Sequence, residues 1–305
     1  MSLSRNVFGI CLMAMILFNC EDTSRSEHIR INKFIIEVEE LVEIIHDDSV
    51  IVLDLRKPDQ FRTNHIPNAI NIWRSEIQSD SFPYQGMLAE KHLLESVFGS
   101  KGIKNDQFLI MYDDKGSCEA TRLWWMLNYY GYEKMAILNG GITAWNEVDS
   151  LTARVKQYPK ATFKLPDIVR PETIVKAAKL VDMRDSVTLL DTRTKSEFTG
   201  EVLKSGAMLR GRIPGSKHID WIDAVDPITN KFRSIDELDS LYKQVVDSAN
   251  SQIVTYCHSG VRSSHTFFIL SELLGYTNVQ NFDGSWVEWT HFDLPVEAGE
   301  TADKQ

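Results

Sequence analysis

Apolar and polar residues alternate along this chain in blocks that predict strands and helices in turn. Short, almost wholly apolar runs are typical of strands buried on both faces. These runs are residues 50–55, 107–112, 187–191 and 252–256. Amphipathic stretches follow two of them, at 120–131 and 263–275, and each ends in the glycine that often terminates a helix. Strands alternating with helices predict α/β units around a parallel sheet.

The same order of motifs occurs twice, which indicates a duplicated domain. "IVLDLRKPDQF" is matched by "TLLDTRTKSEF", "HIPNA" by "RIPGS", "YYGYEKMAIL" by "LLGYTNVQNF" and "NGGITAW" by "DGSWVEW". Four ordered matches with small changes in spacing indicate tandem domains that differ by loop insertions. We predict a first repeat at 32–150, a linker at 151–170, a second repeat at 171–299 and a frayed tail at 300–305.

The first twenty residues (1–20) are expected to be a targeting segment. Arg5 precedes an apolar run, 7–18, that is too short to span a bilayer. The run ends in "LFNC" at Cys20, which resembles a bacterial lipoprotein signal with Cys20 as the lipidated residue. An ordinary cleaved signal and an uncleaved apolar tail are the alternatives. We therefore expect export to the periplasm or outer membrane, with 21–31 as a tether and membrane contact only through a lipid anchor.

Composition argues against two kinds of partner. The formal net charge of −10, from 43 acidic and 33 basic residues, disfavours nucleic acid and anionic membranes. The eight histidines show no close pairing such as His-Glu-x-x-His, so the sequence predicts no metal site. The 305 residues, 43% of them hydrophobic, are enough for two domains with cores of their own.

The loop "CHSGVR" is the candidate for chemistry. Cys257 stands at the carboxyl end of a predicted strand, where parallel sheets bind ligands. Gly260 permits a tight turn, and Ser263 or Ser264 is expected to cap the next helix. Inward-facing backbone N–H groups, the helix N-terminus and Arg262 should stabilise a thiolate. The loop is thus predicted to supply a nucleophile and an anion pocket, the alternative being a cysteine that only packs.

The matched loop of the first repeat, "YDDKGSC", is predicted to be catalytically silent. It has Asp113 in place of Cys257 and needs one extra residue to align. Cys118 and Cys257 are the two cysteines outside the targeting segment, too few for a disulfide framework. Cys118 is interpreted as a spectator thiol, with a resolving role as the alternative.

Together these motifs resemble the tandem-domain rhodanese-like sulfurtransferases over about residues 34–295. The motifs that carry the resemblance are the Asp-x-Arg strand ends, the Ile-Pro-Gly turn, "FPYQGML", "YDDKGSCEATRLWWML", "LNGGITAW", "CHSGVR" and "DGSWVEW". The resemblance implies an α/β protein of two rhodanese-like domains, each a parallel sheet flanked by helices. It also implies an enzyme that moves a sulfane sulfur, without a cofactor, from a small anionic donor to a thiol or a small redox protein.

Roles for single residues follow from the same resemblance. Cys257 would be the nucleophile and persulfide carrier. Arg262 would grip the donor or close the loop by a bidentate contact. Asp191 would brace the loop, or alternatively cap a nearby turn. The persulfide would be stabilised by the backbone N–H groups of the loop, which belong to His258, Ser259, Gly260, Val261 and Arg262.

The donor-binding cations depart from the family pattern. The places where relatives carry such cations hold His258, Ser259 and Glu197. Arg210 and Arg212 therefore become the candidates to hold a sulfonate or carboxylate. The alternative is that both are solvated surface arginines. Thiosulfate is the preferred donor, because these arginines and Arg262 suit a compact dianion, and 3-mercaptopyruvate is the alternative.

Two other functional classes stay open. Phosphatases of the same architecture place five residues between cysteine and arginine, whereas four intervene between Cys257 and Arg262. The tighter ring suits one sulfur atom better than a phosphate. A sulfur-carrier or binding module with a decayed loop is the other class, and only the first repeat shows such decay.

Overall fold

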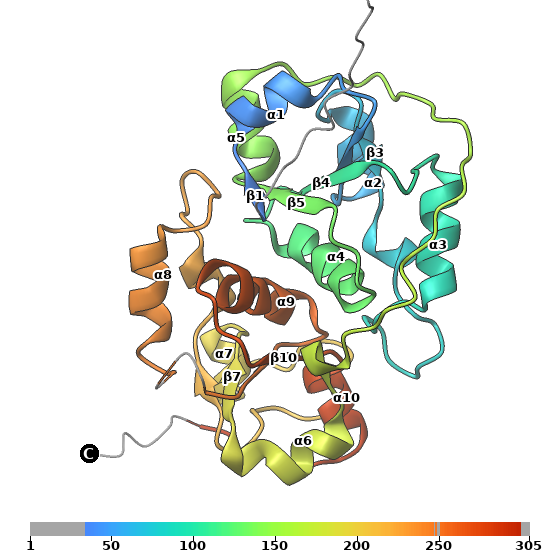
Figure 1. Ribbon diagram of the computed structural model, residues 1–305. Helices are drawn as coiled ribbons and strands as arrows, with labels where there is room; N and C mark the ends of the chain where they lie inside the picture. Colours follow the sequence, from blue (N-terminus) through green and yellow to red (C-terminus); the bar gives the residue numbers. More distant parts are fainter. Residues whose placement is uncertain (1–33, 247, 249–250, 300–305) are drawn as a thin grey trace, which may run out of the picture. The chain divides into compact units, whose positions relative to one another are not determined.

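Two five-stranded parallel sheets, one in each repeat, form the framework of the computed structural model, which describes residues 34–246, 248 and 251–299 (Figure 1). The first sheet has the order β1 (Ile35–Ile36), β5 (Met135–Leu138), β4 (Phe108–Tyr112), β2 (Val50–Asp54) and β3 (Ile70–Asn71). The second has the order β6 (Ile174–Val175), β10 (Val279–Phe282), β9 (Ile253–Tyr256), β7 (Thr188–Asp191) and β8 (Lys217–His218). The pairings within both sheets are parallel. The predicted α/β class and the duplication are confirmed.

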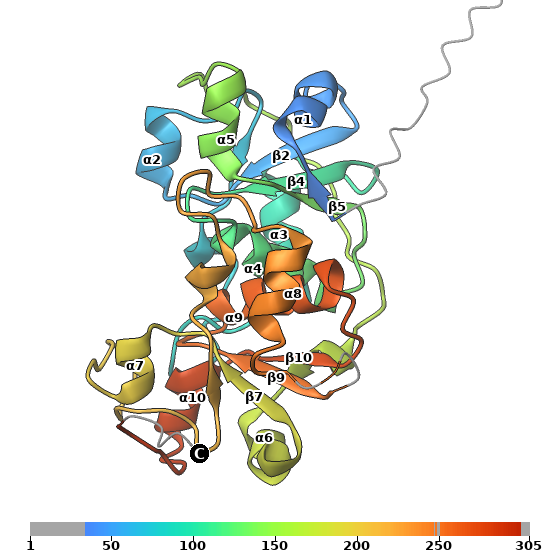
Figure 2. The ribbon, with the colours of Figure 1, turned by 90° about the vertical axis from the view of Figure 1, so that its left-hand side faces the viewer.

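Helices cover the sheets, as the apolar strands require. Strands β2 and β9 are buried at every residue, which needs cover on both faces (Figures 1 and 2). The helices of the first repeat are α1 (Val38–Ile44), α2 (Pro58–Thr63), α3 (Lys91–Ser100), α4 (Cys118–Tyr129) and α5 (Gly141–Val148). Those of the second are α6 (Ala177–Met183), α7 (Lys195–Thr199), α8 (Ile235–Tyr242), α9 (Val261–Phe268) and α10 (Ser285–His291).

The central strands β4 and β9 place the two matched loops. Each lies third in its sheet, with strands paired on both sides. Loop 113–117 connects β4 to α4, and loop 257–260 connects β9 to α9. Both loops therefore start at the carboxyl edge of a parallel sheet, the edge where such sheets bind ligands.

Helices α4 and α9 pack against each other and join the two repeats (Figure 2). Trp124 of α4 meets Phe268 of α9 edge to face, with ring centroids 4.9 Å apart. Both side chains belong to a hydrophobic cluster that also includes Trp125 and Phe267. Burial of aromatic rings at this contact draws together the loops at the starts of the two helices.

The loop before helix α4 has one residue more than the loop before helix α9. Helix α4 starts five residues after Asp113, whereas α9 starts four residues after Cys257. A π-turn, Ile269–Leu273, continues α9 and accommodates one more residue than an α-turn would. Gly131 and Gly275 then follow the matching helix ends, both with φ of +70°. These left-handed glycines agree with the predicted helix terminators.

The segment 151–170 between the repeats forms no helix, and its strand pairing is a single bridge from Thr152 to His65. It nevertheless packs on the first repeat, because Phe163 is buried with its ring centroid 4.9 Å from that of Phe98. Apolar burial therefore orders this segment in spite of its irregular backbone.

Some sequence-based expectations fall outside the described residues. They concern the targeting segment, Cys20, the tether and the tail at 300–305. In the part of the chain that is described, no helix has the length and apolar character needed to cross a membrane. Export and lipidation stay predictions.

Candidate active site

Cys257 lies directly after β9 and is only 1% exposed. The turn that follows it depends on Gly260, which has φ of +78° and stands just before α9. A Cβ atom at this glycine would lie 2.6 Å from the carbonyl oxygen of Asp283. Both the backbone conformation and the lack of space require glycine here, as predicted for a tight ring.

The surroundings of the Cys257 sulfur favour a thiolate. Burial alone would raise the pKa of this thiol. The charge of Arg262, the hydroxyl of Ser263 and the backbone N–H groups of Ser263 and Ser259 outweigh burial and lower the pKa below its ordinary value. The Ser263 hydroxyl lies 3.5 Å from Sγ. Inward-facing amides and a nearby cation are the combination that activates a cysteine, and here they outweigh the opposing effect of burial.

Helix α10 holds the other polar groups of the loop. The hydroxyl of Ser285 accepts hydrogen bonds from the backbone N–H groups of Cys257 and Gly260, both at 3.1 Å. The carbonyls of Cys257 and His258 accept from the backbone N–H groups of Trp286 and Val287, at 3.0 and 3.1 Å. This corrects one expectation, because the Gly260 amide binds Ser285 and not the sulfur. Sequence reasoning did not single out Ser285.

The predicted helix cap is also corrected. Helix α9 begins at Val261 and has Gly260 as its N-cap, so Ser263 and Ser264 lie inside its first turn. The Ser264 hydroxyl donates to the Gly260 carbonyl at 2.6 Å, whereas that of Ser263 approaches Cys257. The helix starts earlier than a serine cap would imply, because the glycine already makes the turn.

Arg262 makes a bidentate ion pair with Glu197 of α7. Its two terminal nitrogens lie 2.6 and 2.9 Å from the carboxylate oxygens. Burial alone would raise the pKa of Glu197, but the hydrogen bonds and charge of Arg262 lower it to about 2. Arg262 thus makes its bidentate contact with a helix outside the loop, not within the loop as expected, and this contact fixes the guanidinium where its charge acts on the Cys257 thiol.

Two further cations lie within electrostatic reach of Cys257. Lys204 is exposed, and its pKa is lowered by partial burial and by Arg262, against an opposing effect of Glu197 and the Cys257 thiolate. Arg74, in the first repeat, binds Glu119, and Cys257 helps to raise its pKa. Neither cation was predicted. Lys204 belongs to the same irregular segment as Arg210 and Arg212, which were predicted to hold the donor.

The predicted donor-binding role of Arg212 is wrong, because its side chain is buried and both terminal nitrogens bind other groups of the protein. Arg212 is 1% exposed, pairs with Glu297 and donates to the Gly299 carbonyl at 2.7 Å. Its guanidinium also lies 4.4 Å from the centre of the Phe198 ring. Arg210 is exposed and bonds to the Glu201 carbonyl, so its donor-binding role stays a prediction.

Asp191 touches the residue before the loop and not the loop itself, and it accepts the backbone N–H of Arg193 at 3.0 Å, which agrees with the alternative of capping a nearby turn. It is fully buried and accepts from Arg193 at 2.5 Å, as Asp54 does from Arg56 at 2.6 Å in the first repeat. It pairs with Tyr256, the residue before Cys257, across strands β7 and β9 and through a side-chain hydrogen bond. Because both repeats keep this pair, the Asp-x-Arg motif supports the strand end in each.

The remaining predicted residues line the loop. The His258 ring lies 3.0 Å from the Ser205 carbonyl through Nε2, and burial lowers its pKa to about 4. The imidazole is therefore neutral near pH 7 and donates from Nε2. Val261 is buried at the start of α9, whereas Ser259 is half-buried and comes close to Gly86 of the first repeat.

In the first repeat a carboxylate occupies the matched ring of amides. Asp113 is buried and accepts from the backbone N–H groups of Lys115, Ser117, Glu119 and Ala120, at 2.7 to 3.0 Å. Burial raises the pKa of Asp113 to about 6, although these amides lower it. The turn after β4 thus directs several backbone N–H groups at one acceptor, although its loop is one residue longer than the loop around Cys257.

Cys118 has the opposite properties to Cys257. It is buried, and its pKa is raised well above the ordinary value by burial and by the charges of Glu119 and Asp113. It therefore stays a protonated thiol near pH 7.

Buried polar contacts connect the two repeats beside the loop. Arg122 of α4 forms an ion pair with Asp283 at 2.6 Å and donates to the carbonyls of Gly260 and Gly86, at 3.2 and 2.7 Å. Asp283 also accepts from the backbone N–H of Leu88 at 2.7 Å. The first repeat therefore takes part in holding the candidate site of the second.

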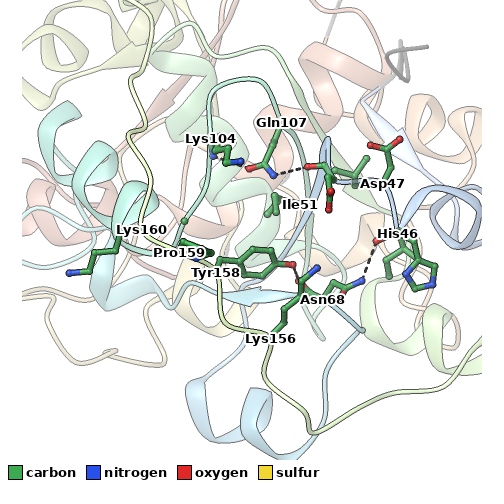
Figure 3. Close-up of a pocket in the computed structure, with 14 residues that line it drawn as sticks. His46, Asp47, Ile51, Asn68, Lys104, Gln107, Lys156, Tyr158, Pro159 and Lys160 are labelled. Atoms are coloured by element: carbon green, nitrogen blue, oxygen red, sulfur yellow. Dashed lines mark hydrogen bonds between the residues drawn. The ribbon is translucent and has the colours of Figure 1, made fainter. Parts of the chain in front are cut away.

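A separate hollow of about 280 Å³ opens in the first repeat (Figure 3). Ile51, Lys104, Gln107 and Tyr158 are among its lining residues, and the Tyr158 hydroxyl donates to the Asn68 carbonyl at 2.8 Å. It lies beside the starts of β2 and β4, opposite the edge where parallel sheets bind ligands. Among the described residues there is no group of three or more His, Cys, Asp or Glu that could hold a metal ion.

Comparison with known sequences points to one family. The family model described as Rhodanese-like domain matches the chain twice, at residues 37–148 and 175–292. The chain is 31% identical over 274 residues to a sulfur carrier protein, TtuD, of Thermus thermophilus, covering 85% of this chain and 94% of that protein. It is 33% identical over 248 residues to a thiosulfate sulfurtransferase of Corynebacterium glutamicum, covering 77% and 80%.

Solved structures agree with this grouping. The crystal structure of SseA from Escherichia coli, described among 3-mercaptopyruvate sulfotransferases, superposes with a TM-score of 0.74 at 26% identity. The match covers 83% of this chain and 99% of SseA. Both repeats therefore take part in the similarity.

Proposed function

Since the chain belongs to the rhodanese-like family and is a sulfurtransferase, we propose that it carries the transferred sulfur as a persulfide on Cys257, with thiosulfate as the preferred donor. The observation that supports this assignment most directly is the lowered pKa of a buried thiol inside a ring of backbone amides. A thiolate is the nucleophilic form of cysteine, so the lowered pKa increases the share of the required species at a given pH.

The reaction takes place in two displacements. The Cys257 thiolate attacks the outer sulfur of thiosulfate, the S–S bond of the donor breaks, and sulfite leaves with the bonding electron pair. A thiophilic acceptor then attacks the terminal sulfur of the persulfide, which regenerates the thiolate. The steps balance without an oxidant, a reductant or a cofactor, and the covalent intermediate separates donor from acceptor.

The loop stabilises charge at both stages. The backbone N–H groups of Ser259 and Ser263 point toward the Cys257 sulfur and can follow the charge to the terminal sulfur of the persulfide. Arg262 supplies a fixed positive field, because Glu197 holds its guanidinium. Fixed donors and charges of this kind need no reorganisation during the reaction.

Lys204 is the cation we assign to the incoming donor, while Arg74, bound to Glu119, adds positive charge from the first repeat. Both interact electrostatically with Cys257, one from each repeat. Arg212 is buried in its own contacts, and both terminal nitrogens of Arg262 bind Glu197. An exposed ammonium can meet the sulfonate end of thiosulfate while the outer sulfur faces the thiolate.

The choice of donor is tested by kinetics. We expect a higher kcat/KM for thiosulfate than for 3-mercaptopyruvate, because the cations suit a compact dianion. The control is Cys257→Ser, which should be inactive with both donors. Since SseA is described among 3-mercaptopyruvate sulfotransferases, a large preference for 3-mercaptopyruvate is the result that would reverse the assignment.

The persulfide itself is tested by mass spectrometry. After incubation with thiosulfate and removal of excess donor, the intact protein should gain the mass of one sulfur atom, located at Cys257. Cys257→Ser should show no gain. Absence of an adduct with thiosulfate and with 3-mercaptopyruvate would contradict the persulfide assignment.

A sulfur-carrier role is the second candidate, because the Thermus thermophilus relative is named as a sulfur carrier protein. A carrier would load Cys257 and then transfer the sulfur to another protein rather than turn over rapidly with small thiols. Comparing single loading with steady-state turnover on small acceptors separates the two roles. Loading without turnover favours the carrier.

A further inference from the structure

Ser285, at the start of α10, has a backbone conformation that favours glycine. Its φ is +51°, in the left-handed region. The matched motif of the first repeat, "NGGITAW", has Gly141 at the corresponding position, with φ of +53°. The second repeat therefore keeps a serine where the backbone is strained for any residue with a Cβ. Backbone strain of this kind persists where the side chain makes contacts that offset it.

The hydroxyl of Ser285 uses its full bonding capacity. It donates to the Phe282 carbonyl at 2.7 Å and accepts from the N–H groups of Cys257 and Gly260, both at 3.1 Å. A hydroxyl has one proton to donate and two lone pairs. The side chain is fully buried, so each of these contacts replaces a bond to water.

The two bound amides are those of the first and last residues of the loop. One oxygen atom thus fixes the distance between Cys257 and Gly260. Between these two residues, the backbone N–H of Ser259 faces the sulfur, and beyond the loop the backbone N–H of Ser263 does so too. The curvature that aims these amides therefore depends on where the Ser285 hydroxyl holds the two ends.

A capping role for α10 does not explain this arrangement. Gly284 is the N-cap, and the Ser285 hydroxyl accepts from the loop instead of from its own helix. In the first repeat the carboxylate of Asp113 accepts the loop amides, so the loop closes around it without a serine. A sulfur atom is a poorer hydrogen-bond acceptor than a carboxylate, so the second repeat needs a different acceptor for its loop amides.

We propose that Ser285 is the positioning residue of the Cys257 loop, whose hydroxyl ties the loop ends so that the amides of Ser259 and Ser263 face the sulfur. The strained backbone is retained because it brings the hydroxyl between the two amides. This inference rests on the proposed function only in that the loop is taken as the place where sulfur is carried.

Two substitutions separate positioning from stability. Ser285→Ala removes the hydroxyl and keeps the strain, whereas Ser285→Gly removes the hydroxyl and relieves it. The control is Ser216→Ala, because Ser216 is also a buried serine of the second repeat and bonds the Ile213 carbonyl and the Tyr256 hydroxyl, neither of which belongs to loop 257–260. The alkylation rate of Cys257 across pH gives the thiol pKa, urea unfolding gives stability, and mass spectrometry gives sulfur loading.

We expect both Ser285 variants to raise the thiol pKa equally and, at a pH below the thiol pKa, to slow alkylation about tenfold for each unit of that rise. Ser285→Gly should unfold at a higher urea concentration than Ser285→Ala, so the shared loss of reactivity cannot come from instability. Ser216→Ala should keep the wild-type thiol pKa.

Unchanged thiol pKa and loading in Ser285→Gly would overturn the inference. The wild type tests the proposed function separately. If the wild type takes no sulfur while the Ser285 variants still raise the thiol pKa, the persulfide role fails and the positioning role stands.

Discussion

The guanidinium of Arg122, in the first repeat, donates to the carbonyl oxygen of Gly260, in the Cys257 loop of the second, at 3.2 Å. The reciprocal contact also exists. The His265 ring of α9 lies 3.1 Å from the carbonyl of Gly116, in the loop of the first repeat. Burial lowers the pKa of His265 to about 3, so the neutral ring donates to that carbonyl. Each loop is therefore held in part by a helix of the other repeat.

Arg122→Met should destabilise the protein strongly. The substitution leaves the carboxylate of Asp283 buried without its ion-pair partner, and breaking one side of such a pair costs about 3–5 kcal/mol. Urea unfolding measures the loss, and adding Asp283→Asn should recover part of it. A loss below about 1 kcal/mol would contradict the role given to this pair.

Lys231→Met is the matched control for that experiment. Lys231 and Glu37 also join the two repeats, at 2.7 Å, but their side chains are 36% and 39% exposed. Exposed pairs contribute about 0–1 kcal/mol, so the free energy of unfolding should change little. The comparison isolates burial as the cause of the Arg122 effect.

Gly260→Ala should abolish sulfur transfer. The new Cβ would lie 2.6 Å from the Asp283 carbonyl oxygen at a φ of +78°, so the loop must move. Gly275→Ala is the control, because Gly275 has φ of +70° with nothing within 4 Å of an added Cβ. It should cost about 1 kcal/mol of stability while kcat/KM stays at the wild-type value. Equal activity of the two variants would contradict the steric argument.

Alkylation near pH 7 should label Cys257 and leave Cys118 unmodified. The pKa of the Cys257 thiol is lowered, so its thiolate persists as the pH falls below the range of an ordinary thiol. The raised pKa of Cys118 keeps that thiol protonated. Peptide mapping locates the label, and Cys118→Ser should keep the wild-type loading with sulfur. Loss of loading in Cys118→Ser would instead support a resolving role.

Acid should weaken the protein through Glu197. Its pKa is lowered from 4.5 to about 2, so the unfolded chain binds the proton more tightly than the folded one. The contribution is complete above about pH 4.5 and is lost as the pH falls toward 2, a change of about 3 kcal/mol. Glu197→Gln should flatten this part of the pH dependence in urea unfolding. The same slope in the variant would show that other carboxylates cause it.

Local signals were enough to find the Cys257 loop in the sequence. A cysteine at the end of an apolar strand, a glycine three residues later and an arginine after it all lie within one turn. The structure places Gly260 in the left-handed conformation that such a turn needs. The duplication was equally readable, because four motifs recur in the same order, among them the Asp-x-Arg ends of the matched strands β2 and β7.

Residues whose partners are distant in the sequence were misassigned or missed. Arg212 has the charge expected of a donor-binding residue, but its partner Glu297 comes 85 positions later. Arg74 belongs to the other repeat, and no local pattern connects it with Cys257. Ser285 did carry a signal, since a serine replaces a glycine of the matched motif. The meaning of this replacement is clear only once the φ of Ser285 is known.

The carboxylate of Asp113 has a consequence for the working cycle. Because it belongs to the chain, the amides around it are occupied whether or not sulfur is bound elsewhere. The shape of that turn is therefore independent of turnover. Helix α4 follows this turn, and the guanidinium of its Arg122 contacts Gly260 in the other repeat. Both therefore support the Cys257 loop in the same way whether or not it carries sulfur.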